Sequence, residues 1–82
     1  MARATVPGNT DAILAQLLHD ERPRLLQSLR RLCGADAEDV LQEALTKVWR
    51  LRHSFDPTQN GSGWLVRAAL RTLVDFRARQ RQ

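Results

Sequence analysis

Apolar residues recur at helical spacing in every segment of the chain except one loop and the first nine residues. Residues that favour strands are scarce, because Tyr is absent and there are only two Trp and two Phe among 82 residues. This length is enough for one domain and too short for two. The sequence therefore predicts an all-α domain, a small bundle of three to four helices.

Breaks in the helical spacing predict where the first helices begin and end. Residues 1–9 mix small and polar types and are expected to be disordered, so that the folded domain spans residues 10–82. Thr10 or the Asn before it can cap a first helix. Pro23 predicts a break or kink between this helix and a second one, which Gly34 ends as a C-cap.

A third helix is expected to begin near Ala35 or Asp36, with acidic residues in its first turn that suit the helix dipole. Residues 53–63 contain Pro, Asn, Gly and Ser and predict a loop. The last helix is expected to begin between Ser62 and Trp64 and to run to the end of the chain. The spacing predicts a core that includes Leu17, Leu25, Leu29, Val40, Leu41, Leu45, Val48, Leu65, Ala69 and Phe76.

The residues give no support for an enzyme, a metal site or a membrane-spanning protein. No glycine-rich phosphate loop is present, and neither His19 nor His53 has a nucleophile and a carboxylate around it, so we expect no enzyme and no cofactor. The single cysteine, Cys33, lies in an apolar pattern that favours a buried thiol, and no Cys/His cluster predicts a metal site. The absence of a signal-like or membrane-spanning apolar run predicts a cytoplasmic protein.

Two polar surfaces remain as candidates for function. The first is one face of the third predicted helix, with Asp39, Gln42, Glu43, Thr46 and Lys47; by composition alone it is a solvated face with Glu43 and Lys47 paired four residues apart. The second is a stripe on the last helix, with Trp64, Arg67 and Arg71. A ring beside guanidinium groups suits unpaired bases, whereas the alternative is a core tryptophan beside solvated arginines. The net charge of +4 agrees with either reading.

Residues 36–50 have the sequence Asp-Ala-Glu-Asp-Val-Leu-Gln-Glu-Ala-Leu-Thr-Lys-Val-Trp-Arg. This stretch resembles the polymerase-binding helix of one protein family, the extracytoplasmic-function (ECF) sigma factors. Residues 64–69, Trp-Leu-Val-Arg-Ala-Ala, are similar to the start of its promoter-reading helix, and residues 22–26 are similar to the break between its first two helices. The three stretches occur in the family's order and spacing, which identifies the chain as the family's second conserved region.

The resemblance implies two partners. The third helix would dock on the clamp helices of the β′ subunit of core RNA polymerase, with Asp39, Gln42 and Glu43 at the contacting positions and Thr46 and Lys47 on the same face. The loop and last helix would read the single-stranded minus-ten element of the promoter, with one base flipped into a loop pocket. The matching residues are Gln59, Asn60, Ser62, Trp64, Arg67 and Arg71.

Three further points follow from the resemblance. An anti-sigma factor is an expected partner. Many relatives carry Arg-Asn where this chain has Leu70-Arg71, so its promoter preference is expected to differ. A complete member continues into a helix-turn-helix domain, so this sequence is expected to be either an excised domain or a one-domain relative, and its basic end suggests an excised domain. The alternative function is a sigma-like module that binds polymerase or an anti-sigma factor without reading DNA.

Overall fold

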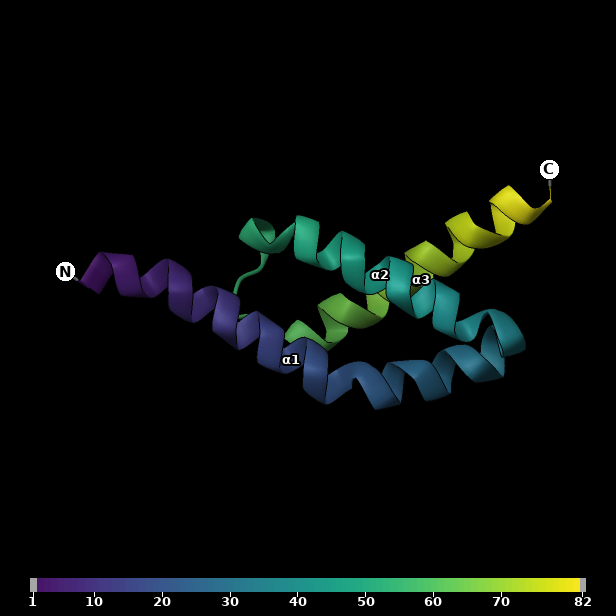
Figure 1. The fold of residues 1–82 in the computed structure, drawn as a ribbon, viewed down its shortest axis with the longest axis horizontal. Coiled ribbons are helices and arrows are strands. Elements are labelled where there is room, and N and C mark those ends of the chain that lie inside the picture. Colours follow the sequence, from purple (N-terminus) through teal and green to yellow (C-terminus); the bar gives the residue numbers. More distant parts are fainter. Residues whose placement is uncertain (1, 82) are drawn as a thin grey trace.

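Three α-helices, joined by a short turn and a longer loop, make up the fold in a computed structural model, which describes the backbone of residues 2–81 and the side chains of residues 10–81. The helices are α1 (Ala2–Cys33), α2 (Ala37–Arg50) and α3 (Gly61–Gln80), with 3₁₀ turns at Gly34–Asp36 and Arg52–Ser54. Helix α2 packs against both α1 and α3, which also touch each other (Figure 1). No strand occurs in the described part of the chain, and the predicted all-α class is confirmed.

Helix α1 differs from the prediction at two places. It begins at Ala2, so residues expected to be irregular lie in its first turns, whereas Met1 lies outside the described residues. It also continues through Pro23, where two separate helices were expected. Proline lacks an N–H and crowds the carbonyl four residues earlier, which bends a helix without always ending it. Figure 1 shows the corresponding change in direction part-way along α1.

The turn between α1 and α2 agrees with the predicted glycine stop. Gly34 has φ of +57°, a left-handed conformation that glycine adopts without the steric cost of a Cβ atom. Arg30 and Arg31 lie in the last turn of α1, where cations are favoured. Arg77 of α3 donates a hydrogen bond to the Leu32 carbonyl, so the end of α1 is also held by the last helix.

The core lies where the three helices meet. Most of the predicted core residues are buried, whereas Leu17, Leu45 and Phe76 are partly buried and pack against its edge. Phe55, which comes from the loop, is only 8% exposed and extends the core to the base of α3. The buried apolar residues are Leu14, Leu25, Leu29, Ala37, Val40, Leu41, Ala44, Val48, Phe55, Leu65, Ala69 and Leu73.

Candidate functional site

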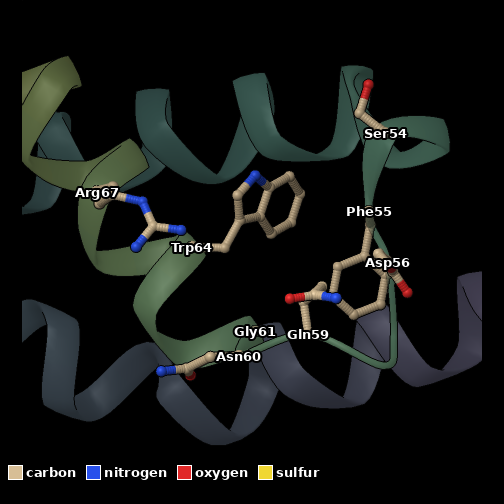
Figure 2. Close-up of a pocket in the computed structure, with 8 residues that line it drawn as sticks. All are labelled: Ser54, Phe55, Asp56, Gln59, Asn60, Gly61, Trp64 and Arg67. Carbon is tan, nitrogen blue, oxygen red and sulfur yellow. The ribbon is translucent and has the colours of Figure 1, made fainter.

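A cavity of about 250 Å³ opens between the loop and the first turns of α3 (Figure 2). Four of the residues predicted from the sequence to bind DNA line this cavity, namely Gln59, Asn60, Trp64 and Arg67. Residues from the loop and from α3 therefore meet at one cavity. The lining residues are Ser54, Phe55, Asp56, Gln59, Asn60, Gly61, Trp64 and Arg67.

Two aromatic rings form the apolar wall of this cavity. The centroids of Phe55 and Trp64 lie 5.3 Å apart, and their planes make an angle of 34°. Phe55 is buried, whereas Trp64 is partly buried at the edge of the core. Figure 2 shows the Trp64 indole extending from α3 over the space beside Phe55. The wall thus offers aromatic surface of the kind on which bases stack.

The loop is held in shape by hydrogen bonds to the Asp56 carboxylate. Its Oδ1 accepts from the Thr58 backbone N–H at 2.9 Å and from the Thr58 hydroxyl at 2.7 Å. The backbone N–H of Gln59 also donates to the Asp56 carbonyl at 3.0 Å. Hydrogen bonds from Thr58 hold the pKa of Asp56 below its ordinary value, and a side-chain hydrogen bond from Gln59 adds to this effect. Asp56 is therefore ionised at neutral pH.

Asn60 and Ser62 have structural partners at the start of α3. The Asn60 side-chain oxygen accepts from the Gly63 N–H at 3.0 Å, which makes Asn60 the N-cap of the helix. The Ser62 hydroxyl donates to a Glu21 carboxylate oxygen at 2.9 Å and ties α3 to α1. Ser62 does not line the cavity, although the sequence placed it among the DNA-binding residues.

Arg67 and Arg71 share one side of α3 but have different surroundings. Arg67 lines the cavity beside the loop. Arg71 forms an ion pair with Asp75 at 3.8 Å and lines a second hollow of about 160 Å³ between α2 and α3. Trp64 contributes to both hollows, so the predicted stripe runs from one to the other.

The polar face of α2 divides into an exposed part and a part bound to α3. Asp39, Gln42 and Thr46 are exposed to solvent. Glu43 instead accepts two hydrogen bonds from Arg79, at 2.7 and 2.9 Å, and its pKa is lowered chiefly by this contact. Lys47 lies 3.6 Å from both Glu43 and Asp75. Glu43 and Lys47 therefore join α2 to α3 as well as facing outward in part.

Trp49 lies on the exposed part of α2. Its side chain is 38% exposed, and the Arg52 guanidinium lies 4.9 Å from the ring centroid. With Leu45, Gln42 and Thr46 it borders a shallow hollow of about 360 Å³. The position of Trp49, three residues after Thr46, is the feature of the sequence that could have predicted an apolar contribution to this face.

In a comparison with protein families, the model for sigma-70 region 2 matches residues 17–82. This match covers most of the chain. The chain belongs to the sigma-70 region 2 family. The matched residues include part of α1 and both of the surfaces described above. Comparisons with curated proteins and with solved structures gave no match.

Membership of the sigma-70 region 2 family supports a role in transcription initiation, through RNA polymerase binding and promoter recognition. The ECF subgroup, the individual contacting residues and an anti-sigma partner stay predictions. Among the described residues, no group of three or more His, Cys, Asp or Glu side chains could hold a metal ion. No described helix is long and apolar enough to cross a membrane.

Proposed function

We propose that this sigma-70 region 2 domain holds core RNA polymerase with α2 and reads the opened minus-ten element of a promoter with the loop and α3. The observation that carries the proposal is the cavity at the base of α3, which combines two aromatic rings with one exposed arginine. Stacking on a ring and contact of a phosphate with a cation are the two interactions by which proteins hold unpaired strands.

A base flipped out of the strand would enter the cavity beside Trp64. Stacking on an aromatic ring is worth roughly 1–3 kcal/mol per base, which offsets part of the cost of unstacking. Arg67 at the cavity and Arg71 one turn further along α3 would each contact a phosphate of the strand. A base that is paired and stacked inside a duplex could not enter the cavity, so the proposal requires single-stranded DNA.

The polymerase contact would be made by the exposed part of the α2 face. Asp39 and Gln42 supply polar groups, and Trp49 supplies exposed apolar surface beside them. Aromatic residues of this kind often carry much of the binding energy of a protein interface. Glu43 and Lys47 are partly exposed and can contribute while they remain paired with Arg79 and Asp75 of α3.

The decisive experiment measures both partners with the whole chain. The chain is first tested for capture by the purified β′ clamp helices, and the bound and free forms are then titrated with a minus-ten single strand, its scrambled sequence and a duplex. We expect capture and a preference for the minus-ten single strand. An Asp39→Ala/Gln42→Ala double variant should lose capture, whereas Gln27→Ala, at an exposed position of α1, should keep it.

The outcomes separate the proposed function from its alternative. Capture by the clamp helices with equal, weak affinity for all three nucleic acids would indicate a protein-interaction module that does not read DNA. Capture that the double variant does not reduce would show that the α2 face is a solvated surface. Failure of both measurements would overturn the proposal as a whole.

A further inference from the structure

Helix α3 carries an apolar stripe on its surface. Val66, Leu70 and Val74 recur every fourth residue, which places them on one side of the helix. They are 42–63% exposed, and none of them lines either of the two hollows that contain Trp64. Leu32 of α1 is 47% exposed and, together with Val66 and Leu70, lines a third hollow between α1 and α3. These four apolar residues make up an exposed surface, the α1–α3 patch.

The α1–α3 patch is hollowed where the two helices meet. The hollow has a volume of about 70 Å³ and is lined by apolar residues of both helices, with Arg24 and Ser28 as its polar members. Sites for drug-sized ligands are much larger, at about 300–1,000 Å³. The size and lining of this hollow instead fit a single apolar side chain that projects from another protein. Exposed apolar surface with a polar rim is typical of a site of protein–protein contact.

Positive side chains surround the α1–α3 patch on both helices. Arg24 lines the hollow, and Arg31 lies seven residues later, on the same side of α1. Arg77 of α3 reaches the patch as well, because it donates a hydrogen bond to the Leu32 carbonyl. Residues 22–33 and 61–74, which supply the two sides of the patch, contain no Asp or Glu. A partner that matches this surface must therefore carry carboxylates around an apolar centre.

The carboxylates of α1 and α3 that are nearest to these stretches contact other residues. Glu21 accepts a hydrogen bond from Ser62 through one oxygen, and its other oxygen lies 3.7 Å from Arg24. It therefore neutralises that arginine only in part. Asp75 lies 3.6 Å from Lys47 of α2 and so joins α3 to a different helix. The rim of the patch keeps a net positive charge.

We propose that the α1–α3 patch binds an acidic amphipathic helix of a partner protein. Such a helix places apolar residues three or four positions apart, which matches the spacing of the stripe on α3. One of these residues would fill the hollow, and carboxylates beside it would lie near Arg24 and Arg31. The proposal is independent of promoter reading, because the α1–α3 patch does not line the DNA-binding cavity.

Two other occupants match the α1–α3 patch less well. A second copy of the chain would bring the same positive charges to the interface, and like charges placed across an interface repel. An acidic membrane surface would attract the arginines, but it offers no discrete side chain for the hollow. The combination of a small apolar hollow with a positive rim therefore favours a helix of the opposite charge.

The test selects partners for the whole immobilised chain from a displayed library of amphipathic helices. Each helix has leucines three and four positions apart, and its flanking positions carry Glu, Gln or Lys at random. We expect Glu to exceed Lys at the flanking positions of the bound helices by at least about tenfold, because opposite charges attract across the interface. The affinity of one selected Glu-rich peptide for each variant is then measured by fluorescence anisotropy.

One pair of variants tests the apolar part of the patch. Leu70→Asp should weaken binding of the selected peptide by about tenfold or more, because it places a charge beside the hollow. Ile13→Asp changes a similarly exposed apolar residue on the N-terminal part of α1 and should leave the affinity unchanged. Val74→Asp, at a more exposed position of the same stripe, takes the place of Leu70→Asp if urea unfolding shows that Leu70→Asp is not folded.

A second pair tests the positive rim. Arg24→Gln/Arg31→Gln should weaken binding of the peptide and flatten its dependence on salt concentration, because the attraction between charges is screened by salt. Arg30→Gln/Arg50→Gln removes the same amount of charge, from an arginine that pairs with Glu38 of α2 and from one at the end of α2. This control should keep both the affinity and the salt dependence.

Several results would overturn the proposal. Equal enrichment of Glu, Gln and Lys would remove the argument from charge, and unchanged affinity in Leu70→Asp and Val74→Asp would place the peptide elsewhere. A dimer of the unmutated chain that Leu70→Asp abolishes in sedimentation velocity would assign the α1–α3 patch to a second copy. Binding to phosphatidylserine vesicles that Leu70→Asp abolishes, with no enriched helix, would assign it to a lipid surface. Titration with the minus-ten strand tests promoter reading separately from all of these results.

Discussion

Glu43 of α2 and Arg79 of α3 form a two-pronged ion pair, with both carboxylate oxygens bound to the guanidinium at 2.7 and 2.9 Å. Glu43 was predicted from its family position to face polymerase, yet it also fixes the distance between the polymerase-facing helix and the DNA-facing helix. Lys47 reaches both Glu43 and Asp75 at 3.6 Å and adds a second link between the same helices. Substitution of Glu43 therefore tests stability as well as binding.

We expect Glu43→Gln to lower the free energy of unfolding by about 0.5–1 kcal/mol at pH 7, since paired charges that are partly exposed contribute little more. The folded-state pKa of Glu43 is lowered, so the stabilisation is present above the unfolded pKa of about 4.3 and is lost as the pH falls through the folded value. Urea unfolding at pH 7 and pH 3.5 should show the difference from the unmutated chain shrinking. Glu38→Gln, which removes a single exposed contact with Arg30, should have a smaller effect, and equal stability of both variants would contradict the prediction.

The number and order of the elements after Gly34 could be predicted from local pattern alone. The amphipathic spacing of α2 and the glycine and asparagine turn before α3 each depend on neighbouring residues. Pro23 shows where local reasoning ends, because proline disfavours helix on its own. Leu14 and Leu29 lie on opposite sides of this proline along α1, and both are buried in the one core. Tertiary packing of both segments therefore stabilises one continuous helix.

Individual side-chain roles at the site were less accessible to sequence reasoning. The bond between Ser62 and Glu21 joins residues 41 positions apart, and no local pattern indicates it. The exposure of Trp49 depends on where α1 and α3 pass α2, which spacing along α2 alone does not specify. In contrast, Asn60 as a helix cap and Arg67 beside the loop follow from short-range geometry, and the structure places both at the cavity.

The close approach of Leu17 to Gly61 predicts that a larger residue at position 61 would disturb the packing. A Cβ atom added at Gly61 would lie 2.6 Å from Cδ2 of Leu17 and 3.4 Å from Cε1 of Phe55. We expect Gly61→Ala to lower the free energy of unfolding by about 1 kcal/mol, because the Leu17 side chain must shift. The Leu17→Ala/Gly61→Ala double variant should lose less than the sum of the two single variants, and strict additivity in urea unfolding would contradict the proposed clash.

The bond from Ser62 to Glu21 predicts that Ser62 acts on stability and not directly on DNA. We expect Ser62→Ala to lower the free energy of unfolding by about 1 kcal/mol, because Glu21 is left partly buried without this donor. Its affinity for single-stranded DNA should stay within about twofold of the unmutated value, measured where both proteins are fully folded. A large loss of affinity in a protein of normal stability would show that Ser62 contacts the strand, as the family position implies.

The two arginines of α3 should differ in their contribution to DNA binding. Arg67 borders the cavity, whereas Arg71 is already paired with Asp75. The Asp75 carboxylate partly neutralises the positive charge that Arg71 presents to the strand. We expect Arg67→Ala to weaken binding of a minus-ten single strand by about tenfold and to reduce the slope of log affinity against log salt concentration by roughly 0.7, as for one lost phosphate contact. Arg71→Ala should weaken binding less, and a change in sequence preference would indicate that it contacts a base.

Arg24→Ala, which removes an exposed charge from α1, is the matched control. Equal losses of affinity in Arg24→Ala and Arg67→Ala would show that the strand is attracted only by the overall positive charge. A strand bound at the cavity would instead depend more on Arg67 than on an arginine of another helix.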